Sequence, residues 1–148
     1  MVTYIQNKKA HFDFEFLKKF EAGLVLSGAE VKAIRQGKGN LKGAHVVVRG
    51  GEAFLVGASI TEYQPANTPK NYEPERTRKL LLSRKELAEI ENQTDQAGLT
   101  AIPIRLYNNK SKIKLELAIA RGKKKHDKRE SLKKRDSKRE IERTLKSQ

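Results

Sequence analysis

The chain has 148 residues, of which 36% are hydrophobic and 34% are charged, and its formal net charge is +14. This length and composition allow one compact domain with a modest core, and the charge favours a polyanion such as nucleic acid as the partner. Because the chain contains no cysteine, disulfides and thiolate metal sites are excluded, as is usual in the cytoplasm. No segment resembles a membrane span or a secretory signal, so we expect a soluble, cytoplasmic protein.

The positive charge is concentrated at the C-terminal end. Residues 121–148 contain thirteen Lys or Arg and only five Asp or Glu. Beyond Gly122 only two leucines and one isoleucine are apolar, too little surface to offset the entropy cost of folding. We therefore expect a folded domain over residues 1–122 and a basic C-terminal tail over 123–148 that is disordered on its own.

Two short helices are predicted in the first part of the chain, near residues 11–18 and 29–36. In the second, Val31 and Ile34 share one side, and Gly37 can end the helix. Aromatic residues gather around the first: Tyr4, Phe12, Phe14, Phe16 and Phe20. We expect them to lock this helix onto the core, with base stacking as the alternative.

Strands and one longer helix follow. The clearest hairpin is VVVRGGEAFLVGASI, where Gly50–Gly51 can adopt the positive φ angles of a tight turn. Ser83 and Glu86 have the spacing of a capping box, which predicts a helix over about 84–97 that Gly98 can end.

Two closing strands are predicted at the end of the domain. In IPIRLYNNKS the apolar residues alternate before a turn at Asn108–Asn109, and in KIKLELAIA one face is apolar: Ile113, Leu115, Leu117 and Ile119. A small antiparallel sheet removes its edges by closing on itself, and a helix between the third and fourth strands suggests an OB-like topology. The expected fold is mainly β with flanking helices, an OB-like closed antiparallel β-barrel.

Catalytic and metal-binding motifs are missing from the sequence. His11, His45 and His126 are far apart, without cysteines or a cluster of carboxylates near them. QGKGN lacks the spacing of a phosphate-binding loop, so it is interpreted as a solvated turn in which Lys38 could still meet a phosphate. We expect no enzymatic activity, no cofactor and no metal.

Binding of a folded RNA has better support. PERTRKLLL places Arg76, Arg78 and Lys79 just before an apolar strand, where they could contact an RNA backbone or simply form a solvated loop. Aromatic residues make up only 6% of the chain, which favours recognition of backbone and shape over stacking of successive bases.

Several long motifs carry a resemblance to a known family: NKKAHFDF, FEAGLVLSGAEVKAIRQGKGNL, GEAFLVGASI, RTRKLLLSRKEL and GKKKHDKRESLKKRD. From about Asn7 to Arg135 the chain resembles the SsrA-binding proteins (small protein B, SmpB) of bacterial trans-translation. The resemblance implies an OB-like barrel that binds the tRNA-like domain of transfer-messenger RNA (tmRNA) and delivers it to ribosomes stalled on messages without a stop codon. It also implies that the protein has no catalytic activity.

The resemblance further implies partners. The tail would meet 16S rRNA in the decoding centre and the empty mRNA channel of the ribosome, and elongation factor Tu would act indirectly through aminoacylated tmRNA. The protein is expected to be a monomer and to have no membrane partner. Two alternatives stay open: a general basic OB-type RNA-binding or ribosomal protein, and an assembly protein whose tail docks an acidic partner.

By the same resemblance, a set of residues is expected to face tmRNA: Asn7, Lys8, Glu21, Lys38, Asn40, Arg76, Arg78, Lys79 and Leu81. The acidic residue of this set, expected just before the first strand, could accept hydrogen bonds from base amines or position a neighbouring cation, or else complete an internal ion pair. Ser83 is interpreted as a structural helix cap.

The tail is expected to become helical on the ribosome. As a helix over residues 123–146 it would place cations on one stripe: Lys124, Lys128, Arg135, Arg139 and Lys146. The resemblance assigns the decoding-centre contacts to one run: Lys123, Lys124, His126, Asp127, Lys128 and Arg129. Here the imidazole could stack on an rRNA base, and the cations could contact phosphates.

Overall fold

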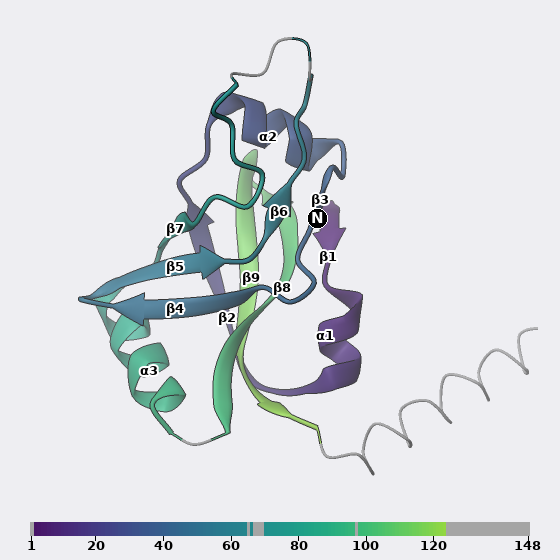
Figure 1. The fold of residues 1–148 in the computed structure, drawn as a ribbon. Helices are drawn as coiled ribbons and strands as arrows, with labels where there is room; N and C mark the ends of the chain where they lie inside the picture. The colour runs from purple at the N-terminus through teal and green to yellow at the C-terminus, as the bar shows by residue number, and fades with distance from the viewer. Residues whose placement is uncertain (1, 65, 67–69, 97, 124–148) are drawn as a thin grey trace, which may run out of the picture.

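The computed structural model describes residues 2–64, 66, 70–96 and 98–123. Twelve elements follow one another along this part of the chain (Figure 1): β1 (Thr3–Gln6), α1 (Lys8–Asp13), β2 (Phe14–Leu24), α2 (Gly28–Arg35), β3 (Gly39–Asn40), β4 (His45–Arg49), β5 (Glu52–Val56), β6 (Ser59–Ile60), β7 (Arg78–Leu81), α3 (Arg84–Thr94), β8 (Leu99–Asn109) and β9 (Lys112–Gly122). None of the helices in these ranges is long and apolar enough to cross a membrane.

Seven antiparallel strands form one large sheet with the order β1-β8-β4-β5-β7-β2-β9. In addition β8 pairs with β9 along the full length of both strands, and β3 and β6 form a separate pair. Figure 1 shows α2 and α3 at opposite ends of the molecule, with the long strands β8 and β9 running between them. The prediction of a mainly β fold with flanking helices is confirmed.

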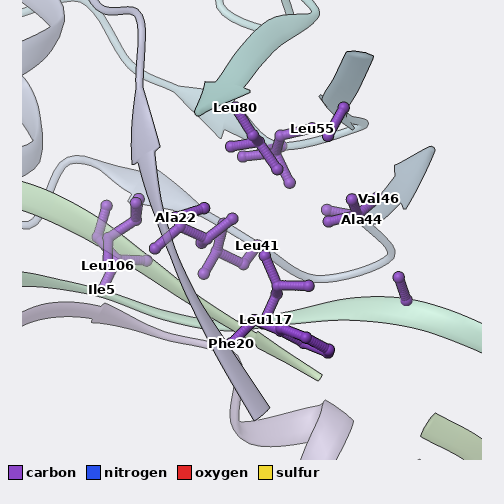
Figure 2. Packing of buried hydrophobic residues seen from close by; sticks show 14 of the residues in the cluster. Ile5, Phe20, Ala22, Leu41, Ala44, Val46, Leu55, Leu80, Leu106 and Leu117 are labelled. Atoms are coloured by element: carbon purple, nitrogen blue, oxygen red, sulfur yellow. The ribbon is translucent and has the colours of Figure 1, made fainter. Parts of the chain in front are cut away.

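A single main core lies on the inner side of this sheet. Figure 2 shows side chains from five strands gathered around the same interior: Phe20, Ala22, Leu55, Leu80, Leu106 and Leu117. The predicted apolar face of β9 is confirmed, because Ile113, Leu115, Leu117 and Ile119 are all buried. Since side chains alternate along a strand, Glu21 on β2 and Lys114 and Glu116 on β9 point away from this core.

The predicted hairpin and capping box are also confirmed. β4 and β5 pair on either side of Gly50 and Gly51, whose φ angles are +61° and +75°. Ser83 Oγ accepts from the Glu86 backbone N–H, and the Glu86 carboxylate accepts from the Ser83 backbone N–H, both at 3.2 Å. The helix ends at Thr94, somewhat earlier than predicted.

The predicted helix over residues 11–18 is wrong beyond Asp13, and the observed helix begins earlier, at Lys8. The helix ends at Asp13, and Phe14 begins an eleven-residue strand, so that Glu21 lies inside a strand rather than before it. The backbone of this strand pairs with β9 from Phe14 to Gly23, and these long-range hydrogen bonds outweigh the weak local preference for a short helix. Of the aromatic residues, Phe20 is buried in the main core.

The predicted turn at Asn108–Asn109 is wrong by two residues. Both asparagines belong to β8, and the turn is formed by Lys110 and Ser111, whose φ angles are +50° and +66°. Pairing of Asn109 with Lys112 leaves only these two residues to reverse the chain. The Asn109 side chain is thereby placed on the surface of the sheet.

Candidate nucleic-acid interface

Strands β7, β2, β9 and β8 share a surface on the side of the sheet away from the core. The strand register aligns its residues in two rows: Leu81, Gly23, Lys114 and Tyr107 in one, and Glu21, Glu116 and Arg105 in the other. We call these residues, together with Asn109, the outer face. Glu21 points outward because Phe20 and Ala22, its neighbours along β2, are buried in the core.

The Glu21 carboxylate accepts hydrogen bonds from two neutral donors. The Tyr107 hydroxyl donates to Oε2, and Asn109 Nδ2 lies 3.2 Å from each carboxylate oxygen. The hydrogen bond from Tyr107 is the main cause of the lowered pKa of Glu21, with Asn109 and the charge of Lys114 acting in the same direction. Glu21 is therefore an ionised side chain that accepts hydrogen bonds only, and it is exposed.

Tyr107 is held in turn by its surroundings. Burial, followed by the hydrogen bond to Glu21, raises the pKa of Tyr107, so that the hydroxyl keeps its proton. The Arg105 guanidinium covers the ring at 4.1 Å from its centroid, and its Nη1 donates to Thr3 Oγ1 at 2.9 Å. Arg105 Nε lies 3.4 Å from Glu116 Oε1. These contacts form one network that restricts the orientation of Glu21.

A groove of about 380 Å³ adjoins the outer face at Gly23, Leu81 and Lys114. Its other lining residues are Leu24, Leu26, Val31, Arg35, Ser111, Lys112 and Ile113. Most of these lining residues are apolar, and we call them the floor; the lining also includes three cations, Arg35, Lys112 and Lys114. Gly23 keeps the floor open, since a Cβ atom there would lie 3.3 Å from Leu81 Cβ and 3.7 Å from Lys114 Nζ. Leu81 is 53% exposed, although it is a large apolar residue.

A second glutamate, Glu30 in α2, is the centre of a buried ion-pair network. Its Oε2 lies 2.7 Å from Arg78 Nε, and its Oε1 lies 2.5 Å from Arg76 Nη2. Burial opposes ionisation, but the Ser27 backbone N–H and the two guanidinium groups outweigh it and lower the pKa of Glu30. The network ties the segment before β7 to α2.

Arg78 is enclosed completely, with 0% of its side chain exposed. Besides its bonds to Glu30, its Nη1 donates to the carbonyls of Ala58 and Arg76, and its Nη2 donates to that of Pro74. The sequence places Arg78 among the residues that face RNA, but every guanidinium nitrogen is used within the chain. In this structure Arg78 therefore holds other residues in place and has no exposed atom for a partner.

The other two cations of PERTRKLLL are accessible. Arg76 is 42% exposed while it pairs with Glu30, and Lys79 projects from β7 and pairs with Glu52 at 3.0 Å. The Lys79–Glu52 pair is exposed on both sides, so it is weak and can exchange for a phosphate. The predicted group of three cations is thus divided by the fold into one buried and two accessible residues.

Asn7 and Lys8 lie at the start of α1. Asn7 is 5% exposed; its Nδ2 donates to Pro103 O at 2.9 Å, and its Oδ1 accepts from the Ala10 backbone N–H at 3.3 Å. Asn7 thus caps α1 and fixes it to β8. Lys8, the first residue of the helix, is exposed.

Lys38 and Asn40 lie between α2 and the end of β3. Lys38 Nζ donates to Tyr63 O at 3.2 Å, and Asn40 Oδ1 accepts from the Lys42 backbone N–H at 2.8 Å. Asn40 is exposed. Its hydrogen bond shapes the turn that follows.

The predicted tail begins beside α1. Lys123, its first residue, donates from its backbone N–H to Asp13 O at 2.8 Å and from Nζ to His11 O at 3.1 Å. Burial is the main cause of the lowered pKa of His11. The other tail residues singled out from the sequence lie outside the described residues: Lys124, His126, Asp127, Lys128 and Arg129.

Sequence reasoning missed five residues around the outer face and groove: Tyr107, Asn109, Arg105, Lys114 and Arg35. Alternation in β9 indicated that Lys114 lies on its wet side. The approach of β8 to Glu21 depends on the register of strands 86 residues apart, which no local pattern reveals.

The outer face and groove combine an anionic acceptor, cations and an apolar floor on one surface. Cations suit phosphates, a carboxylate suits base amines, and an apolar floor suits a base ring. Within the ranges that the structure describes, no three His, Asp or Glu side chains come together to hold a metal ion. Together these groups make a surface that is suited to binding a nucleic acid.

Known proteins resemble the chain over nearly its whole length. The family described as SmpB protein matches residues 4–147. The SsrA-binding protein of Syntrophobacter fumaroxidans (strain DSM 10017 / MPOB) is 50% identical over 141 residues, covering 95% of this chain and 87% of the relative. That of Chelativorans sp. (strain BNC1) is 50% identical over 147 residues, covering 99% and 94%.

A solved structure agrees with these relatives. One chain of the structure described as "tmRNA-SmpB: a journey to the center of the bacterial ribosome" is 36% identical and superimposes with a TM-score of 0.69. The match covers 86% of this chain and 92% of the other. Sequence and fold therefore agree that the chain belongs to the SmpB family of SsrA-binding proteins.

Proposed function

We propose that this protein binds tmRNA and delivers it to stalled ribosomes in trans-translation. Membership of the SsrA-binding family supports this function, as does the similarity to a chain solved with tmRNA and the bacterial ribosome. The outer face connects this function to particular residues. Here an ionised Glu21, flanking cations and the groove at Leu81 are exposed together. The tRNA-like domain of tmRNA is the part of the RNA that this surface would bind.

An OB-like closed β-barrel would suit this task. β8, β4, β5, β7, β2 and β9 pair in succession, and the pairing of β9 with β8 returns to the first strand. Closure would remove the sheet edges and make a rigid base for the outer face. In this proposal residues 1–122 form the RNA-binding domain.

The exposed members of the predicted set, together with the half-buried Lys38, would contact the RNA directly. Cations would meet phosphates at four places: Lys8, Lys38, Arg76 and Lys79. Asn40 would add a polar contact. Asn7 and Arg78, both buried, would instead hold α1 and the segment before β7 in position.

Residues 123–148 would form a separate ribosome-facing tail. The described start of this tail is tied to α1 through Lys123, and the remainder lies outside the described residues. We propose that the tail becomes helical against 16S rRNA in the mRNA channel and decoding centre, where RNA contacts offset the cost of ordering it. His126 would stack on a base, and Lys124, Lys128 and Arg129 would contact phosphates.

The proposal also includes a location, an oligomeric state and an indirect partner. The protein would act in the cytoplasm as a monomer, without catalytic activity, and elongation factor Tu would join indirectly through aminoacylated tmRNA. A general basic OB-type RNA-binding or ribosomal protein is the main rival. It would bind many RNAs with little preference and with a steep dependence on salt.

Competition binding tests the proposed function. The full chain is titrated against the labelled tRNA-like domain with ordinary tRNA as competitor at physiological salt. We expect the tRNA-like domain to be preferred, whereas equal competition by ordinary tRNA would favour the rival.

Changing Asp127, Lys128 and Arg129 together to Ala should leave this binding nearly intact and reduce peptide tagging of stalled chains. Equal loss of both activities would contradict separate roles for domain and tail.

A further inference from the structure

We propose that a hollow between α1 and the turn before β4 binds one nucleotide of ribosomal RNA. The nucleotide phosphate would contact Lys9 and Lys42, and its base would lie against an apolar wall. We call this site the α1 hollow. The inference rests on the proposed function, to which it adds a contact between the folded domain and the ribosome.

The α1 hollow has a volume of about 230 Å³. One part of its lining comes from α1, another comes from residues 42–45, and β8 contributes Ile102. Figure 1 shows α1 beside the segment that joins β3 to β4. Pockets for drug-sized molecules are larger, about 300–1,000 Å³. The α1 hollow therefore suits one small group, such as a single base ring.

Both sides of the α1 hollow are held in place within the chain. Asn7 caps α1 and donates from Nδ2 to Leu41 O at 3.3 Å, which joins the helix to the turn. Within the turn, Asn40 Oδ1 accepts from the Lys42 backbone N–H at 2.8 Å, and the Ala44 backbone N–H donates to Leu41 O at 3.0 Å. Because these contacts exist before a ligand arrives, binding would cost little additional ordering of the site.

The lining of the α1 hollow combines apolar and charged side chains. The apolar wall consists of four residues: Ala10, Phe14, Ala44 and Ile102. Lys9, Lys42 and His45 are exposed, and the two lysines outnumber Asp13, the acid in the lining. Cations suit a phosphate, and an apolar wall suits the face of a base. A nucleotide carries both groups on one unit, so it matches the whole lining.

The α1 hollow is separate from the groove. Phe14 in the hollow pairs with Gly122, whereas Gly23 in the groove pairs with Lys114. Gly23 follows Phe14 by nine positions on β2, which corresponds to about 30 Å along an extended strand. One nucleotide cannot reach both places. An RNA bound at the groove thus leaves the α1 hollow open to a second RNA.

The start of the tail lies beside the α1 hollow. Asp13 lines the hollow, and its backbone carbonyl accepts from the Lys123 backbone N–H at 2.8 Å. Because the proposed function places the tail against 16S rRNA, the hollow would come close to the same RNA. Lys8, next to Lys9 in α1, adds positive charge there. Ribosomal RNA is therefore the polyanion that the location favours.

Removal of two cations provides the first test. The full chain carrying Lys9→Ala and Lys42→Ala is combined with tmRNA, and its association with stalled ribosomes is measured at several salt concentrations. We expect association to be about ten-fold weaker, and the slope of log affinity against log salt to fall by about 1–2, because two phosphate contacts are lost. Affinity for the isolated tRNA-like domain should stay nearly unchanged.

A matched control removes the same charge elsewhere. Arg84 and Lys85 are exposed at the start of α3 and do not line the α1 hollow. The full chain carrying Arg84→Ala and Lys85→Ala should associate with stalled ribosomes almost as well as the wild type. Thermal unfolding of both double variants checks that each folds as the wild type does.

A cross-link identifies the occupant of the α1 hollow. The chain contains no cysteine, so His45→Cys introduces a single thiol in the lining and keeps both lysines. A short photoactivated cross-linker on this thiol should react with one position of ribosomal RNA in the stalled ribosome. Adding Lys9→Ala should lower the yield, because the nucleotide is held less tightly. Lys85→Cys, the control, should not give this cross-link.

Three outcomes would overturn the inference. Cross-links to a ribosomal protein without any to ribosomal RNA would mean that a protein side chain fills the α1 hollow. Equal loss of ribosome association and of binding to the tRNA-like domain would assign the hollow to tmRNA. Equal weakening by the Arg84 and Lys85 control would leave only nonspecific attraction.

Failure of the inference can be distinguished from failure of the proposed function. If the wild-type complex binds stalled ribosomes and the Lys9 and Lys42 double variant binds equally well, only the α1 hollow lacks a role. If the wild-type complex with tmRNA does not bind stalled ribosomes, the proposed function itself is refuted.

Discussion

Glu21 and Glu30 each accept hydrogen bonds from two side chains, but the donors differ in charge. Glu30 is 1% exposed and is neutralised by two guanidinium groups. Glu21 is exposed, and its donors, a phenol and an amide, leave its negative charge uncancelled. One carboxylate stabilises the fold, and the other remains available to an outside partner.

The same contrast between buried and exposed side chains is found among residues that are close together in the sequence. Arg78 belongs to the buried network, while Lys79 and Leu81 on the same strand point to the surface. Alternation along a strand explains this division. A cationic motif thus contains both buried and accessible cations, and the burial of each one decides whether it can reach a partner.

The largest effect is expected from breaking the buried network. Arg78→Ala would leave Glu30 buried without its main partner and should lower the free energy of unfolding by about 3–5 kcal/mol, as measured by urea denaturation. Lys79→Ala is the matched control: it breaks the exposed pair with Glu52 and should cost less than about 1 kcal/mol. A direct RNA contact by Arg78 would instead reduce RNA affinity and leave stability unchanged.

Acid should weaken the same network. The pKa of Glu30 in the folded chain is lowered from its ordinary value of 4.5, so its ionised form stabilises the fold above that pH. This stabilisation is lost as pH falls from 4.5 through the lowered value. The free energy of unfolding, measured from pH 7 to pH 3, should therefore decrease less in Glu30→Gln than in the wild type. Glu21, whose pKa is also lowered, contributes in the same direction, and Glu21→Gln separates the two contributions.

Elements with a strong local signal were predictable. The Gly50–Gly51 hairpin, the capping box at Ser83 and the apolar face of β9 depend on residues within a few positions of one another. The strand from Phe14 to Leu24 was not predictable in the same way, because it is stabilised by pairing with β9, about a hundred residues away.

The candidate site was predictable only in part. Glu21 and Leu81 followed from the family resemblance, and the structure exposes both on one surface. Asn109 was interpreted as a turn residue, although its side chain reaches Glu21 from the end of β8. Arg78 could not be recognised as buried, because its carboxylate partner lies 48 positions earlier in the chain. Both failures concern partners that only the fold brings together.

The smallest effect is expected for Leu81 in the groove, because this exposed apolar side chain does not stabilise the fold as Glu30 does. Leu81→Ser should weaken binding of the tRNA-like domain several-fold, about 1 kcal/mol, because a base ring would lose apolar contact. Its unfolding free energy should change by less than about 0.5 kcal/mol, since Leu81 is 53% exposed. Leu17→Ser is the control, a leucine 43% exposed on β2 that does not line the groove. If both variants lowered RNA affinity equally, the groove would have no specific role, and general surface hydrophobicity would explain the loss.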